Sequence, residues 1–169
     1  MIALDMDVRT EKIYDYYKDQ YEITYDTKAF GVLVPYTAKR SDRQEKTVLG
    51  FRIGKEIYGP EACEYVFILH YDVLTKDLEK QIEEMLASAE QGYVKPGPDH
   101  AFTFLTAIIV ADKIDDDASA LIKKFKLSHN YQRDGFTMAR IAALLPYGKC
   151  VCSKDGKDLQ RLIEKKIMN

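Results

Sequence analysis

The sequence contains no tryptophan and only three cysteines in 169 residues. A small, odd number of cysteines argues against a framework of disulfide bonds. The first residues, MIALDMDVRTEK, carry acids where a secretory signal needs basic residues, and the longest apolar run, near residues 104–111, is too short to cross a bilayer. These absences predict a cytoplasmic protein that does not enter a membrane.

Several motifs that identify a chemistry are also missing. The chain has no glycine-rich phosphate-binding loop, no paired zinc-ligand motif and no nucleophile elbow. What is present is a hydrophobic content of 46% and a charged content of 31%, which is typical of an ordinary globular protein. A chain of this length suits one domain, so we expect residues 1–169 to fold as a unit.

The first half of the chain has the hydrophobic pattern of successive strands. The runs 30–38, 47–53 and 64–72 are rich in branched and aromatic residues. They predict an antiparallel meander of three strands, with a polar turn at residues 40–45. Pro35 lies inside the first run and favours an edge position for that strand, because proline cannot donate a hydrogen bond to a ladder.

The second half has the pattern of β-α-β units. Residues 74–92 carry one apolar stripe at helical spacing, with Thr75 as the expected N-cap and Gly92 as the expected stop. The runs 101–111 and 136–146 are apolar on both faces, which predicts buried central strands. The whole pattern predicts a single α/β domain, in which a mixed sheet combines a meander with β-α-β units and carries helices on its faces.

Tyrosine is abundant, with twelve in the chain and five of them within residues 14–25. Most of these five fall on a predicted helix at residues 10–22. The spacing favours a packed helix face whose hydroxyl groups reach water. The alternative is a surface on which these rings stack against bases or a partner protein.

Three polar residues follow or end the predicted buried strands. His70 and Asp72 end one strand, and Asp112 ends the next. If the helix between these strands is a crossover connection, the strands are parallel and their C-terminal ends open on the same edge of the sheet. Two carboxylates and an imidazole could then hold Mg²⁺ or Mn²⁺, with Asp72 and Asp112 as metal ligands, and activate water for phosphoryl hydrolysis. The alternative is that these acids only begin turns.

The charge of the chain is divided between its two ends. Residues 1–117 carry 14 basic and 23 acidic residues, a net charge of −9, whereas residues 118–169 carry 11 and 4, a net charge of +7. Basic and aromatic residues together are typical of nucleic-acid binding. The candidate binding residues are Lys123, Lys124, Lys126, His129, Tyr131 and Arg133. The alternatives are compensation of the two charges inside one fold, and self-association into a homo-oligomer.

The order of a helix, a three-strand meander, a helix and a strand resembles the core of restriction-endonuclease-like proteins. That resemblance implies Mg²⁺ bound by an aspartate of the second strand and by a Glu-x-Lys motif of the third. The third run here reads EYVFILH, so Glu64 stands at the acidic position but Val66 replaces the lysine. The catalytic motif is therefore absent, and the resemblance concerns the fold alone.

The stretches AFGVLVPYTAKRSDR, EYVFILHYD, KPGPDHAFTFLTAIIVAD and GFTMARIAALL resemble an uncharacterised family of small Firmicutes proteins. The similarity covers roughly residues 29–165. It implies a cytoplasmic bacterial protein of unknown function and assigns no catalytic residue.

Together these observations favour a non-catalytic binding module that contacts nucleic acid or a protein partner through its basic C-terminal third. A divalent-metal-dependent hydrolase or nuclease that uses His70, Asp72 and Asp112 is the first alternative. A self-associating structural protein is the second. The binding module needs no cofactor, whereas the hydrolase needs Mg²⁺ or Mn²⁺.

Overall fold

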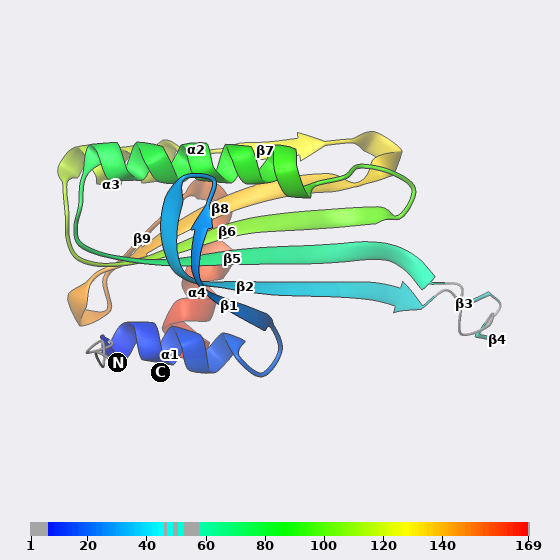
Figure 1. The fold of residues 1–169 in the computed structure, drawn as a ribbon, viewed down its shortest axis with the longest axis horizontal. Coiled ribbons are helices and arrows are strands. Elements are labelled where there is room, and N and C mark those ends of the chain that lie inside the picture. Colours follow the sequence, from blue (N-terminus) through cyan, green and yellow to red (C-terminus); the bar gives the residue numbers. More distant parts are fainter. Residues whose placement is uncertain (1–6, 46, 49–50, 53–57, 169) are drawn as a thin grey trace.

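Seven strands form one mixed sheet in the computed structural model, which describes residues 7–45, 47–48, 51–52 and 58–168. The strand order is β1-β2-β5-β6-β8-β7, and β9 pairs with β8 (Figure 1). These strands are β1 (Glu22–Ala29), β2 (Val32–Glu45), β5 (Tyr58–Leu74), β6 (His100–Ile114), β7 (Leu127–Asn130), β8 (Phe136–Leu144) and β9 (Cys150–Cys152). The predicted single α/β domain with a mixed sheet is confirmed.

Antiparallel and parallel pairs divide the sheet into two parts. β1, β2 and β5 form an antiparallel meander, whereas β5, β6 and β8 run parallel. α2 (Lys76–Tyr93) connects β5 to β6, and α3 (Asp116–Lys124) leads through β7 to β8. The predicted parallel pairing of the two strands that flank α2 is therefore confirmed.

Helices cover both faces of the sheet. α2 and α3 pack on one face, where α2 buries Ile82 in the larger hydrophobic core (Figure 1). α1 (Val8–Tyr17) and α4 (Lys157–Leu162), which continues into a π-helical turn at Ile163–Ile167, pack on the opposite face with Ile13 in a second core. None of the helices described has the length and apolar composition that crossing a membrane requires.

α2 begins where the sequence predicts but ends later. The Thr75 side chain accepts a hydrogen bond from the Leu78 backbone N–H at 3.3 Å, so the predicted N-cap is confirmed. Gly92 is not the stop, because the helix continues to Tyr93. A Cβ atom at Gly92 would lie 3.1 Å from the ring of Phe30, which shows why a residue without a side chain stands there.

The predicted polar turn at residues 40–45 is wrong, because β2 continues through it to Glu45. These residues pair with β5, with Arg40 opposite Glu64 and Asp42 opposite Ala62. A cross-strand ion pair between Arg43 and Glu61, at 3.1 Å, supports the ladder. Cross-strand charge pairs stabilise a polar strand that lacks the hydrophobic alternation of a half-buried one.

The predicted middle strand at residues 47–53 is also wrong. Thr47–Val48 (β3) and Phe51–Arg52 (β4) form a separate two-stranded sheet, and residues 49, 50 and 53 lie outside those described. The third strand of the meander is instead β1, which the sequence analysis placed partly in a helix. α1 ends at Tyr17, five residues before β1 begins.

The β1–β2 hairpin bends away from the sheet at Pro35. The last pair between β2 and β5 joins Tyr36 to Ile68, whereas β2 continues to pair with β1 as far as Val32. Tyr36 lies in the core beneath α1, but Val34, two residues earlier, lies in the core beneath α2. The hairpin therefore crosses from one face to the other, and its turn rises beside α2 (Figure 1). The edge position predicted from proline is wrong, because β1 covers the outer side of β2.

Candidate functional site

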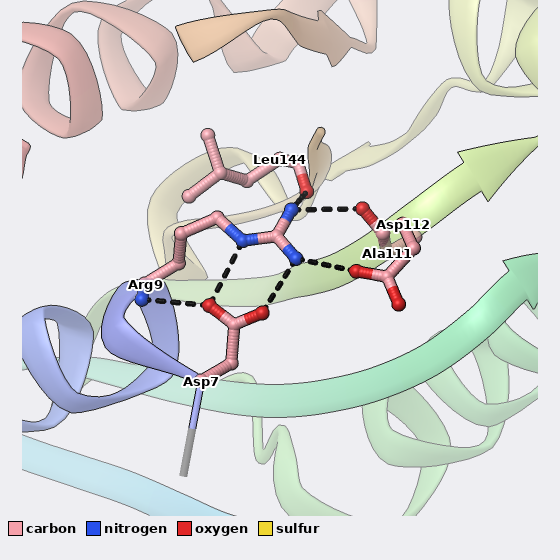
Figure 2. Close-up of polar contacts among 5 residues, drawn as sticks. All are labelled: Asp7, Arg9, Ala111, Asp112 and Leu144. Atoms are coloured by element: carbon pink, nitrogen blue, oxygen red, sulfur yellow. Dashed lines mark hydrogen bonds and ion pairs between the residues drawn. The ribbon is translucent and has the colours of Figure 1, made fainter. Parts of the chain in front are cut away.

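One arginine fixes the start of α1 to the ends of two central strands. The Asp7 side chain caps α1 by accepting from the Arg9 backbone N–H at 2.8 Å. The Arg9 guanidinium donates to both carboxylate oxygens of Asp7, at 2.9 and 2.6 Å, and to Asp112 Oδ1 at 2.8 Å. It also donates to the backbone oxygens of Ala111 and Leu144, at 2.8 and 3.1 Å, near the C-terminal ends of β6 and β8 (Figure 2). We call Asp7, Arg9 and Asp112 the arginine clamp.

Asp7 and Arg9 of the arginine clamp are both charged at every physiological pH. Hydrogen bonds from Arg9 lower the pKa of Asp7 to about 2, although partial burial acts in the opposite direction. The same contact raises the pKa of Arg9. The two side chains are only 15% and 25% exposed, so water screens their attraction weakly. The clamp is therefore a permanent ion pair that positions α1.

The structure brings two of the three predicted strand-end residues together. Ligand atoms of His70 and Asp112 lie within 4.8 Å of one another and of Asp7. Asp72 lies on β5 between Tyr71 and Val73, which pair with Ala111 and Lys113 on either side of Asp112. Among the residues described, however, Asp72 does not belong to the cluster of Asp7, His70 and Asp112. Asp7 was missed because it precedes the predicted first helix. Its one local signal was an aspartate directly before helical spacing, which is a common N-cap.

Arg9 determines what this group can bind. Both oxygens of Asp7 and one oxygen of Asp112 already accept hydrogen bonds from the guanidinium. A divalent cation at the same oxygens would lie a few ångströms from a fixed positive charge, which repels it. The donor set therefore fits an arginine better than Mg²⁺ or Mn²⁺.

Adding millimolar Mn²⁺ to the native protein is expected to leave the amide NMR signals near His70 and Asp112 unbroadened. In an Arg9→Gln variant that circular dichroism shows to be folded, the same signals are expected to broaden, because the two carboxylates are then free. Selective broadening in the native protein would contradict this prediction and would support a metal site beside the clamp.

A cavity of about 440 Å³ lies next to the arginine clamp, where the β1–β2 hairpin leaves β5. Three elements line it: Asp7, Thr10 and Tyr14 from α1 and its cap, Tyr25, Asp26 and Tyr36 from the hairpin, and residues 68–70 from β5. Its volume lies in the range of small-molecule sites, which are mostly apolar with a few polar groups. We call this cavity the tyrosine pocket.

Three tyrosine rings form the walls of the tyrosine pocket. The rings of Tyr14 and Tyr36 meet edge to face, with centroids 5.7 Å apart and planes at 88°. The ring centroid of Tyr25 lies 6.1 Å from that of Tyr14, and the two hydroxyl oxygens are 2.7 Å apart. Burial raises the pKa of Tyr36, and the hydrogen bond with Tyr14 raises the pKa of Tyr25. Tyr25 and Tyr36 are therefore neutral phenols at physiological pH.

The pocket also contains a buried polar atom without a partner. Thr10 is 6% exposed, and its Oγ1 has no hydrogen-bond partner among the residues described, although its backbone oxygen accepts from the Tyr36 hydroxyl at 3.1 Å. An unpaired buried hydroxyl costs about 1–3 kcal/mol. A ligand that supplied the missing hydrogen bond would remove that cost.

The six residues predicted to bind a partner lie along the β7 edge of the sheet. Lys123 and Lys124 end α3, Lys126 precedes β7, and His129 lies within β7. Tyr131 precedes the short helical turn Gln132–Asp134, which contains Arg133. Two of them already have contacts within the fold. His129 Nδ1 lies 2.8 Å from a carboxylate oxygen of Glu90, and the Tyr131 hydroxyl accepts from Thr137 at 3.0 Å.

The basic residues of the C-terminal third do not share one surface. α3 packs on one face of the sheet, whereas α4 and its π-helical turn, with Arg161, Lys165 and Lys166, pack on the other. The positive charge that the sequence concentrates at one end of the chain is thus distributed around the molecule.

Glu64, at the acidic position of the nuclease resemblance, is held by neighbours. It accepts from Arg140 at 2.8 Å and from the Tyr21 hydroxyl at 2.9 Å. The side chains of Glu64 and Arg140 are only 14% and 12% exposed. This carboxylate therefore serves a buried ion pair.

Comparison with protein families matches residues 6–165 to a domain of unknown function (DUF8052), in agreement with the expected uncharacterised family. No curated protein and no solved structure matches the chain. The matched range includes every residue of the arginine clamp and of the tyrosine pocket.

Proposed function

The chain belongs to the DUF8052 family, and from that premise we propose that it is a non-catalytic binding module that holds a small organic molecule in the tyrosine pocket. The observation that carries this proposal is the cavity itself. It is large enough for a small ligand, mainly apolar, and bordered by the polar side chains of Thr10, Asp26 and His70.

The position of the pocket supports the proposal. It adjoins the C-terminal half of β5, and ligands of open α/β sheets bind outside the C-terminal ends of parallel strands. The pocket lies where the hairpin departs from β5 at Pro35, so the course of the backbone contributes to its shape. A cavity with such fixed walls loses little entropy when a ligand binds.

The proposal is non-catalytic because the partly buried carboxylate of the pocket is engaged in the scaffold, whereas Asp26 is exposed. Asp7 is paired with Arg9, and Tyr25 and Tyr36 are neutral phenols with pKa values raised above the ordinary range. A general base needs a free lone pair and a pKa near the working pH. These side chains suit recognition.

A fragment screen followed by NMR is expected to find ligands whose chemical-shift changes map to Tyr14, Tyr25 and Tyr36. Replacing Tyr25 with alanine is expected to weaken them about tenfold, since one aromatic contact contributes about 0.5–1.5 kcal/mol beyond its buried area. The matched control is Tyr147→Ala, because Tyr147 is fully exposed and remote from the lining. Fragments that map elsewhere, or that bind both variants equally, would contradict the proposal.

The other expectations from the sequence stay predictions. They are a nucleic-acid or protein partner at the six residues along the β7 edge, a homo-oligomer, and a cytoplasmic location in a Firmicutes bacterium. Mg²⁺ or Mn²⁺ at Asp72 and Asp112 with His70 is the alternative that the Mn²⁺ titration tests, and the hydrogen bond of Arg9 to Asp112 disfavours it. The tyrosine pocket takes precedence over the β7 edge because it is a cavity, whereas His129 and Tyr131 of that edge already have contacts within the fold.

A further inference from the structure

We infer that the ligand of the tyrosine pocket is an organic cation, namely a protonated amine on a small apolar body. This inference rests on the proposed function and adds the chemical class of the ligand. Three features of the pocket carry it: the sign of its charge, the arrangement of its aromatic rings, and the free hydroxyl of Thr10.

The charge of the lining favours a positive ligand. The residues around the cavity include two aspartates and neither lysine nor arginine. The carboxylate of Asp7 is neutralised by Arg9, but no ion pair found between described residues involves Asp26. Asp26 is exposed at the rim, so it can meet the charge of an entering ligand. A phosphate or carboxylate ligand would face this carboxylate with His70 as the one basic side chain among the lining residues.

The aromatic rings of the pocket also favour a positively charged ligand. A cation binds over the face of an aromatic ring, where the quadrupole is negative. Tyr14 and Tyr36 stand at 88° to one another, so their planes form two perpendicular walls, and Tyr25 adds a third ring at 6.1 Å from Tyr14. The raised pKa values of Tyr25 and Tyr36 keep these rings as intact phenols.

The hydroxyl of Thr10 can become a specific partner for an ammonium group once it turns toward the cavity. Thr10 is a lining residue, and its Oγ1, which is closed off from water, has no hydrogen-bond partner among the residues described. An ammonium group carries only donors, and a hydroxyl oxygen has two lone pairs that accept. An amine is therefore the class of ligand that satisfies Thr10 and is attracted to Asp26 and to the rings.

Asp26 occupies an unusual backbone position that allows a clean test. Its φ of 48° lies in the left-handed region, and the ladder skips its pairing with Pro35. Aspartate and asparagine both tolerate this region better than other residues with side chains. Replacing Asp26 with asparagine therefore removes the charge without straining the hairpin. Asp19→Asn is the matched control, since Asp19 is an exposed aspartate that does not line the cavity.

The experiment compares three probes of similar size and different charge: 2-phenylethylammonium, 2-phenylethanol and 3-phenylpropanoate. Each is titrated into the ¹⁵N-labelled full chain and followed by NMR. The ammonium probe is expected to bind about tenfold more tightly than the alcohol, which corresponds to the interaction of a cation with desolvated rings. The carboxylate is expected to bind more weakly than either. Asp26→Asn should reduce the advantage of the ammonium probe, whereas Asp19→Asn should leave it unchanged.

The outcomes separate this inference from the proposed function. If the alcohol or the carboxylate binds in the pocket with the same affinity as the ammonium probe, the inferred preference for a cation is wrong, but the pocket remains a binding site. Failure of all three probes to shift Tyr14, Tyr25 and Tyr36 would overturn the amine inference, and the fragment screen would then decide the proposed function. Equal effects of the two aspartate variants would remove Asp26 from the site.

Discussion

Replacing Glu79 with glutamine is expected to stabilise the protein by about 3 kcal/mol at pH 7. Glu79 lies on the inner side of α2, is 0% exposed, and neither of its carboxylate oxygens has a hydrogen-bond partner among the residues described. Burial raises the pKa of Glu79 to about 9, and the neighbouring Glu83 adds to the shift. The native state therefore keeps this carboxyl protonated at neutral pH, whereas the unfolded chain releases the proton above a pKa of about 4.5.

The sign of the pH dependence follows from this difference. Unfolding releases a proton at every pH between about 4.5 and about 9, so the free energy of unfolding falls as pH rises through this window. The slope is about 1.4 kcal/mol per pH unit where one proton is released. Urea unfolding between about pH 5 and about pH 8, which lie inside that window, should show this slope in the native protein, and the slope should disappear in Glu79→Gln.

A matched control is available on the same helix. Glu84 is exposed, so Glu84→Gln is expected to change stability by less than about 0.5 kcal/mol and to keep the slope. If Glu79→Gln behaved like the control, the Glu79 carboxyl would be ionised and solvated in the folded state, and the inner face of α2 would have to be wetter than the structure shows.

Replacing Arg9 with alanine is expected to destabilise the protein by about 3 kcal/mol, as when one member of a buried ion pair is removed. The substitution leaves the Asp7 carboxylate unpaired and withdraws donors from the backbone oxygens of Ala111 and Leu144. For a chain of this size the melting temperature should fall by about 8 °C. Because Arg9 also positions α1, which forms one wall of the tyrosine pocket, pocket ligands should bind more weakly as well.

Two further variants test whether geometry or charge matters at this position. Arg9→Lys restores the charge but not the planar set of donors, so an intermediate loss is expected. Arg161→Ala removes an arginine that is 69% exposed and 3.5 Å from Asp158, and it should cost less than about 0.5 kcal/mol. A loss for Arg9→Ala no larger than that for Arg161→Ala would contradict the role of the arginine clamp.

The parts of the fold that the sequence predicts well are those with a local periodic signal. The apolar stripe of α2 and the double-sided apolar run of β6 each determine an element, and a helix between two such strands implies that they are parallel. The exposed half of β2 has no such signal. Residues 40–45 are polar, and pairing with β5 holds them in a strand together with side-chain contacts such as that between Arg43 and Glu61.

The site was only partly predictable for a related reason. His70 and Asp112 were found because parallel strands bring their ends together. The partners of Arg9 are backbone oxygens 102 and 135 residues away along the chain, and no sequence pattern identifies a backbone oxygen. The tyrosine pocket depends on the bend at Pro35. In the sequence, Pro35 indicates an edge strand as long as β1 is not recognised as the neighbour of β2.

The bend at Pro35 also links the stability of the two layers. One short segment of β2 places Val34 under α2 and Tyr36 under α1, so neither core can be dismantled without disturbing the other. Binding to the native state raises the free energy of unfolding by RT ln(1 + L/Kd), where L is the concentration of free ligand. A molecule held against Tyr36 therefore protects the opposite layer too, and the cooperative unit of unfolding is the whole sheet with both of its helical coverings.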